Sequence, residues 1–224
     1  MALENDLAST IEFAENPEPR CPCVLLLDTS RSMEGDPIDA LNAGVQSFRN
    51  ELIKDTVAAR RVEVAVVSFD SEIHVVQPFV VAREFQAPTL TAQGFTCMGT
   101  AINKALDLVQ ERKALYRANG ISYYRPWVLM ITDGDPYGDP DLVIEEARRR
   151  VHDEEEHGHV AFFAVGVEHA AMIALSKMVV RPPIKLEGLK FVEMFSWLST
   201  SMQRASRSQM GEQIPLPSSG VQRY

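Results

Sequence analysis

The chain has 224 residues, a formal net charge of −9 and a hydrophobic content of 46%. Its length and composition are typical of one globular α/β domain with a substantial core, and no apolar run reaches the roughly 20 residues that span a bilayer. The acidic balance argues against nucleic acid or an anionic membrane surface as a partner, because both attract basic surfaces.

The three cysteines, Cys21, Cys23 and Cys97, are too few and odd in number for a disulfide framework. Cys21 and Cys23 stand two residues apart on an expected strand, which favours small core residues over metal ligands. The first ten residues, MALENDLAST, are acidic where a signal peptide is basic and lack its apolar segment. We therefore expect a cytoplasmic protein.

Apolar runs alternate with amphipathic stretches, the pattern of βαβ units and a parallel sheet. Strands are expected at Cys23–Leu27, Val62–Phe69, Ile73–Val76, Trp127–Thr132, Val160–Val165 and Ile184–Leu186. The tight turn after Phe69 predicts an antiparallel hairpin at one edge of the sheet. Three segments follow along the chain: a lead-in at 1–20, the α/β domain at 21–207 and a flexible tail at 208–224.

Helical periodicity predicts five helices between and after these strands. One helix begins at Pro37 and another at Asp139-Pro140. The other three cover Thr100–Tyr116, His169–Met178 and Phe191–Ser206. The aspartates of two Gly-Asp-Pro sequences, Asp36 and Asp139, are expected to cap the helices that follow them. The segment Val80–Phe95 reads as a long loop.

The first strand ends in Asp28, and Ser30 and Ser32 follow at alternating positions in the stretch LLLDTSRSM. Side chains at i, i+2 and i+4 of an extended turn can converge on one point. One carboxylate with two hydroxyls suits a hard cation such as Mg²⁺ and does not suit a metal that prefers nitrogen or sulfur. Taken alone, the pattern also fits an ordinary turn in which Ser and Asp bond to the backbone.

The apolar strand Trp127–Thr132 also ends in an aspartate, Asp133. Both carboxylates then lie at the carboxyl edge of one parallel sheet, where open α/β sheets bind ligands. Two such charges about 5 Å apart repel by about 3 kcal/mol at an effective dielectric of 20, and a divalent ion would relieve this repulsion. Thr96, in the glycine-containing segment QGFTCMGTA, can approach the same edge, whereas the nearby Thr100 is better placed as a helix cap.

This set of residues resembles the metal-ion-dependent adhesion site of von Willebrand factor type A (VWA) domains, in order and in spacing. The resemblance covers roughly Cys23 to Ser206. It implies a doubly wound, mostly parallel sheet with one antiparallel edge strand and helices on both faces. It also implies an intact metal site formed by Asp28, Ser30, Ser32, Thr96 and Asp133.

By this resemblance, the three hydroxyls bind the ion directly or nearly so, and the two carboxylates bind it directly or through water. The ion would be Mg²⁺ or Mn²⁺, with Ca²⁺ less suited to compact, hydroxyl-rich ligation. The open coordination position implies a partner protein that contributes an Asp or Glu. Within the family the chain looks most like bacterial TerY-type proteins of tellurium-resistance and stress operons, so the partner is expected to be another product of the same operon.

The same residues also allow two other interpretations, a phosphatase and a scaffold. A haloacid dehalogenase-type phosphatase also places an aspartate after an apolar strand, but it needs a second aspartate where Ser30 stands and a lysine where only the helical Lys104 is available. None of the three loops that carry the candidate ligands holds a His or Lys that could act as a general base, so we expect no enzyme. A further interpretation is a scaffold with a non-functional site. The histidines between 152 and 159 match no zinc spacing.

Overall fold

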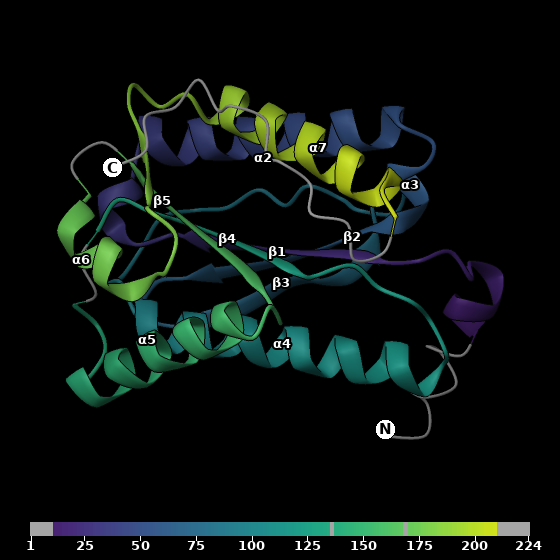
Figure 1. Cartoon of the computed structure of the whole chain (residues 1–224). Helices are drawn as coiled ribbons and strands as arrows, with labels where there is room; N and C mark the ends of the chain where they lie inside the picture. Colours follow the sequence, from purple (N-terminus) through teal and green to yellow (C-terminus); the bar gives the residue numbers. More distant parts are fainter. Residues whose placement is uncertain (1–10, 135–136, 168–169, 210–224) are drawn as a thin grey trace.

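The computed structural model describes residues 11–134, 137–167 and 170–209 (Figure 1). Six strands form one sheet in the order β3-β2-β1-β4-β5-β6. Every neighbouring pair is parallel except β2 and β3. The strands are β1 (Cys21–Asp28), β2 (Val62–Phe69), β3 (Ile73–Val81), β4 (Trp127–Thr132), β5 (Ala161–Val167) and β6 (Ile184–Leu186).

Helices cover both faces of this sheet, so the expected doubly wound fold with one antiparallel edge strand is confirmed (Figure 1). On one face lie α2 (Asp36–Lys54), α3 (Ala58–Arg61) and α7 (Phe191–Arg207), and on the other lie α4 (Met98–Ala118), α5 (Asp141–Glu156) and α6 (Met172–Met178). A short 3-10 helix, η1 (Arg31–Met33), follows β1, and residues 11–15 are helical.

The core consists of two layers because side chains of a strand point alternately to opposite faces. On β1, Cys21, Cys23, Leu25 and Leu27 pack toward α2 and α7, whereas Val24 and Leu26 pack toward α4, α5 and α6. The prediction that Cys21 and Cys23 are small core residues is confirmed, since neither is exposed. Burial raises the pKa of Cys21 to about 12 and raises that of Cys23 as well.

Several element boundaries differ from those expected. β1 begins at Cys21 instead of Cys23, and β3 continues to Val81, so the loop begins later than expected. Asp36 is not an N-cap: Gly35 occupies that position with φ 86°, and Asp36 is the first residue of α2. A positive φ suits glycine, which has no Cβ to clash with the backbone. Part of the helix expected at His169–Met178 and most of the predicted tail lie outside the described residues.

The lead-in contacts the amino edge of the sheet through a buried ionic network that the sequence did not predict. Glu63 on β2 has no exposed side chain and accepts hydrogen bonds from Arg20, at 2.7 Å, and from Arg112 on α4, also at 2.7 Å. Arg112 continues the network to Glu12. Because buried charges are tolerated only when paired, this network holds residues 11–20 against the sheet.

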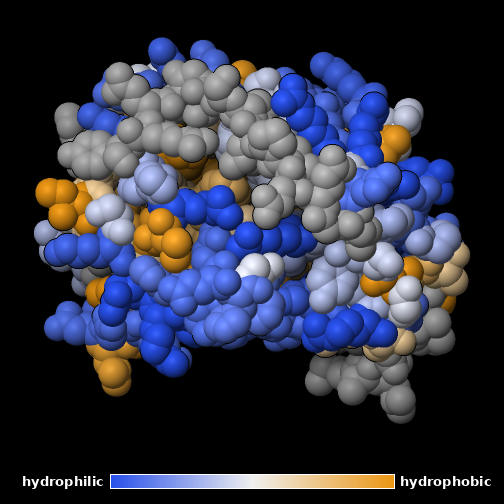
Figure 2. All heavy atoms as spheres, in the orientation of Figure 1, coloured by the Kyte–Doolittle hydropathy of each residue, from blue (hydrophilic) through white to orange (hydrophobic). Residues whose placement is uncertain are grey.

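Hydrophobic residues on the face drawn in Figure 2 form small, separate patches among hydrophilic ones. Scattered exposure of this kind is normal for a globular domain. Within the described part of the chain, no helix combines the length and apolar character needed to cross a membrane.

Candidate metal centre

The candidate site lies between β1 and β4. The chain adds β2 and β3 on one side of β1 and then adds β4, β5 and β6 on the other side. β1 pairs on one side with β2 and on the other with β4, so their carboxyl ends flank a topological switch point. Leu27 is in register with Ile131, which places Asp28 beside Thr132. Asp133 is the next residue after Thr132, so the two aspartates lie at the same edge. Ligands of open α/β sheets bind in the crevice at this position.

Asp28 is held rigidly at the end of β1. One carboxylate oxygen accepts the Ser30 backbone N–H at 2.8 Å, and the other accepts the Thr132 hydroxyl at 2.5 Å. Asp28 has no exposed surface, although it lies at the carboxyl edge of the sheet. Burial raises the pKa of Asp28 to about 6, although the hydrogen bonds from Ser30 and Thr132 oppose this shift.

The two serines and Asp133 form a continuous chain of oxygens. The hydroxyls of Ser30 and Ser32 lie 3.1 Å apart, and Ser32 donates to a carboxylate oxygen of Asp133 at 2.7 Å. The loop after β1 and the loop after β4 therefore meet at one point. Burial raises the pKa of Asp133, while the Ser32 hydrogen bond opposes this shift.

Thr96 reaches the same edge from the loop that precedes α4. This loop is hydrogen-bonded to the loop after β1 through the backbone. The Gln93 N–H donates to the Thr29 carbonyl at 2.7 Å, and the Arg31 N–H donates to the Gly94 carbonyl at 3.2 Å. Thr96 is buried, and a Cβ placed on Gly134 would lie 3.0 Å from its hydroxyl oxygen. Thr96 thus adjoins the residue that follows Asp133.

These five side chains fit a hard divalent cation. They present only oxygen atoms, from three hydroxyls and two carboxylates, which is the chemistry that Mg²⁺ and Mn²⁺ accept. Burial raises the pKa of both carboxyls, so the protein alone stabilises their charges poorly. A cation held between them would favour the ionised forms.

Three supporting residues were missed in the sequence. The sequence predicts Thr132 only as a strand residue, although a hydroxyl at the end of an apolar run is a usable signal. It predicts Asp70 only as a turn residue, but Asp70 is buried, and its carbonyl accepts the N–H of Cys97, the residue after Thr96, at 3.0 Å. Asp139 was expected to cap its own helix; instead Pro140 occupies that position, and Asp139 bonds to the first turn of α4.

The histidine-rich end of α5 does not form a comparable site. His157 and His159 stack with ring centroids 5.6 Å apart, and each lies beside its own acidic residue. Among residues 11–134, 137–167 and 170–209, no group of three or more His, Cys, Asp or Glu side chains is arranged to hold a metal ion. The adjacent basic run is paired, Arg148 with Glu145 and Arg150 with Asp107 of α4.

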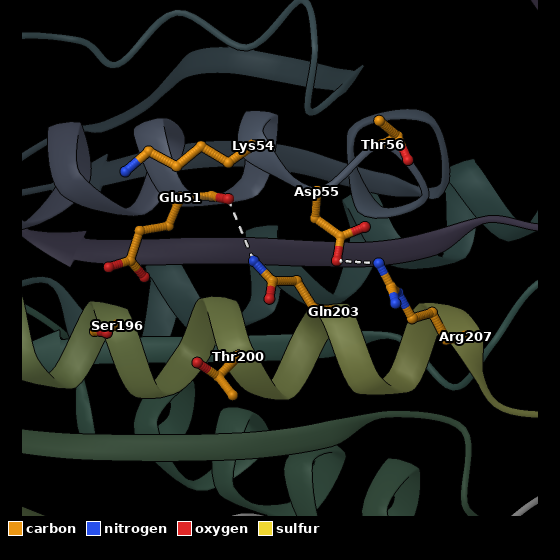
Figure 3. A pocket seen from close by; sticks show the side chains of 8 residues that line it. All are labelled: Glu51, Lys54, Asp55, Thr56, Ser196, Thr200, Gln203 and Arg207. Atoms are coloured by element: carbon orange, nitrogen blue, oxygen red, sulfur yellow. Dashed lines mark hydrogen bonds and ion pairs between the residues drawn. The ribbon is translucent and has the colours of Figure 1, made fainter.

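An open pocket of about 520 Å³ lies elsewhere, between the carboxyl-terminal half of α2 and α7 (Figure 3). Both signs of charge line it, and Arg207 pairs with Asp55 at 2.7 Å. A neutral hydrogen bond also crosses it, from the Gln203 amide to the Glu51 backbone carbonyl at 3.2 Å. None of the five candidate ligands lines this pocket. The candidate metal centre and the pocket are therefore separate features.

Residues 23–192 match the family profile of the von Willebrand factor type A domain. The chain belongs to the von Willebrand factor type A family. This match covers most of the described sheet and all five candidate ligands, so the family predicted from the sequence is confirmed. A search of curated proteins found no match.

Solved structures support the same fold. The vWF domain of the type V pili tip protein Mfa5 from Porphyromonas gingivalis matches with a TM-score of 0.65 at 12% identity, over 88% of this chain and 99% of that one. The pilus adhesin SpaC from Lactobacillus rhamnosus GG matches with a TM-score of 0.67 at 12% identity, over 84% of this chain. A von Willebrand factor type A protein from Catenulispora acidiphila matches with a TM-score of 0.61 at 17% identity, over 83% of this chain.

This chain spans 31% of the SpaC chain and 43% of the Catenulispora chain. At such low identity these likenesses establish the VWA fold and leave the ligand of this chain open. Two of the three relatives are named as pilus components, a tip protein and an adhesin.

Proposed function

We propose that this VWA domain is a metal-dependent protein-binding module with an intact metal-ion-dependent adhesion site. The observation that carries the proposal is the meeting of three loops at one edge of the sheet. There the hydroxyl and carboxylate oxygens of the loops after β1 and β4 form a hydrogen-bonded chain, and the Thr96 hydroxyl lies beside Gly134. The ligands would be Asp28, Ser30, Ser32, Thr96 and Asp133. When bound, Mg²⁺ or Mn²⁺ would supply the positive charge to which a carboxylate of the partner binds.

Two exposed aromatic side chains beside the site support a protein partner. Phe95 is 72% exposed and Tyr137 is 82% exposed. They flank the hydrogen bond from the Gly138 N–H to the Thr96 carbonyl, which is 3.1 Å long. Large aromatic side chains are enriched in protein interfaces, so a partner carboxylate at the metal would bring apolar surface of the same partner onto this pair.

The chemistry of the three loops supports binding without catalysis. Residues 28–35, 93–97 and 132–140 contain no His or Lys that could serve as a general base. Cys97 is a poor nucleophile, because burial and the nearby charges of Asp139 and Asp70 raise its thiol pKa. Lys104 lies within α4, away from the position that a phosphatase of the haloacid dehalogenase type requires.

The cellular context that we propose is a bacterial tellurium-resistance or stress-response system in the cytoplasm. The support is the general likeness to TerY-type proteins together with the acidic sequence of the lead-in. The partner would then be a product of the same operon that presents an accessible Asp or Glu.

Thermal unfolding in EDTA, Mg²⁺, Mn²⁺ and Ca²⁺ tests the metal dependence. A ligand at 100 times its Kd stabilises a folded protein by about 2.7 kcal/mol, and each kcal/mol raises Tm by about 2–4 °C at this size. We therefore expect Mg²⁺ and Mn²⁺ to raise the Tm of the wild type by several degrees. The half-buried Asp133 gives the informative variant, Asp133→Ala, which should lose this increase.

The matched control is Glu34→Ala, which removes an exposed carboxylate from the loop after β1 without touching a proposed ligand. Its side chain is 72% exposed, and its ion pair with Arg31 is long, at 3.9 Å. It should respond to Mg²⁺ as the wild type does. Equal Tm values in EDTA and in millimolar Mg²⁺ or Mn²⁺, or an undiminished response in Asp133→Ala, would contradict the proposal.

A further inference from the structure

Asp139 connects two of the three loops that form the site. It lies in the loop between β4 and α5, downstream of Asp133, yet its hydrogen bonds run to the start of α4. One carboxylate oxygen accepts the Gly99 N–H at 2.6 Å and the Thr100 N–H at 3.2 Å. The other oxygen accepts the Thr100 hydroxyl.

This arrangement caps α4 with a side chain from a different loop. The first N–H groups of a helix have no partners within the helix, and the N-cap residue of α4, Cys97, makes no capping bond of its own. Asp139 provides the missing acceptors. Its carboxylate also lies at the positive end of the α4 dipole, where negative charge is favoured.

The same loop contacts Thr96 at two further points. Gly138 donates its N–H to the Thr96 carbonyl at 3.1 Å, and a Cβ on Gly134 would lie 3.0 Å from the Thr96 hydroxyl oxygen. Gly138 lacks the side chain that would otherwise collide with Cys97, because a Cβ there would lie 2.4 Å from the Cys97 sulfur. Gly134, Gly138 and Asp139 thus lie directly against residues 96–100.

We propose that Asp139 is a positioning residue of the metal centre, which fixes Thr96 relative to Asp133. This inference rests on the proposed function, because Thr96 and Asp133 are two of the proposed ligands. The two ligands belong to different loops, and the carboxylate of Asp139 joins those loops next to both. Loss of a group that orients metal ligands typically weakens metal affinity by about 10- to 100-fold.

The test is the Mn²⁺ affinity of the full chain, measured by titration calorimetry, together with its stability in urea and EDTA. Asp139→Ala should weaken Mn²⁺ binding by about 10-fold or more. Asp139→Asn keeps one acceptor oxygen for the α4 N–H groups and should recover much of this loss, because Asn caps helices about as well as Asp.

Asp55→Ala is the matched control, because Asp55 also accepts N–H groups at the start of a helix. It caps α3 through the N–H groups of Val57, at 3.0 Å, and Ala58, at 3.1 Å. Since α3 leads into the first residue of β2, this cap lies at the amino edge of the sheet, opposite the candidate site. Asp55→Ala should lower stability and leave Mn²⁺ affinity unchanged.

The outcomes distinguish the positioning role of Asp139 from the metal-binding function on which it rests. If Asp139→Ala loses stability but binds Mn²⁺ as the wild type does, Asp139 is only a helix cap and the inference is wrong. If Asp139→Asn binds Mn²⁺ as weakly as Asp139→Ala, the lost charge explains the effect and positioning does not. If the wild type binds no Mn²⁺ at millimolar concentration, the proposed function fails and the inference fails with it.

Discussion

Asp28 places a negative charge in the interior of the domain. Its side chain is fully buried, and burial raises its pKa to about 6 despite the hydrogen bonds from Ser30 and Thr132. A buried charge without a paired cation costs folding free energy. The protein keeps this charge at the carboxyl edge of the sheet, where open α/β sheets bind ligands. Stability is commonly given up for function at sites of this kind.

We predict that Asp28→Asn stabilises the metal-free protein. The amide keeps the shape and one acceptor oxygen for the Ser30 N–H, and it removes the charge that burial disfavours at pH 7. A shift from 3.8 to about 6 corresponds to an effect on the order of 1–3 kcal/mol. Urea unfolding in EDTA should show a higher free energy of unfolding for Asp28→Asn than for the wild type.

The same variant should gain no stability from Mg²⁺, because the neutral amide is a weaker ligand for a hard cation than a carboxylate. Asp133→Asn is the comparison, since Asp133 is less buried and its replacement should stabilise the metal-free protein less. An Asp28→Asn protein that is less stable than the wild type in EDTA would show that the Thr132 and Ser30 bonds to a charged carboxylate outweigh its burial.

At the scale of elements, α2 and α7 pack closely because α2 carries a glycine at their contact. A Cβ on Gly44 would lie 2.6 Å from a ring carbon of Phe195 and 2.9 Å from the Cβ of Phe191. The side of α7 that faces α2 is part of the core and includes Phe191, Phe195 and Leu198. The glycine that receives it could not be identified from sequence, because its role depends on a helix far along the chain.

We predict that Gly44→Ala destabilises the domain although alanine favours helices. Overpacking a core contact costs about 1–3 kcal/mol, which exceeds or offsets the gain of about 1 kcal/mol in helix propensity. Denaturant unfolding of the single variant measures the balance. In a Phe195→Leu background, which removes the ring that the new methyl group meets, the same substitution should cost less, and an equal cost would contradict the close contact.

Helix starts illustrate the limit of local patterns. The chain has three Gly-Asp-Pro sequences, of which the one at 134–136 lies partly outside the described residues. The other two, at 35–37 and 138–140, mark the beginning of a helix, as expected from proline near the first turn. Their aspartates differ: Asp36 is the first residue of α2, while Asp139 caps α4 from the neighbouring loop. The tripeptide predicts a helix start because that depends on local backbone geometry, but the hydrogen-bond partner depends on which loops the fold brings together.

At the scale of the whole molecule, the two edges of the sheet hold different polar groups. The carboxyl edge holds the candidate ligands, and the amino edge holds the network of Arg20, Glu63 and Arg112. The place of the first group in the fold was predictable, because each candidate ligand follows an apolar strand or precedes a helix in the order of a known family. The network was not, because Glu63 occupies a strand position without a sequence signal and its partners come from distant segments.

The most direct test of the metal centre is a crystal structure of the wild type grown with Mn²⁺, with anomalous scattering used to locate the ion. We expect one peak at the carboxyl edge of β1 and β4, with oxygen ligands at about 2.0–2.3 Å drawn from Ser30, Ser32, Thr96, Asp28 and Asp133, some through water. No peak at this edge with Mn²⁺ present at millimolar concentration, or a peak only at the exposed His157 and His159, would contradict the assignment of these residues as a metal centre.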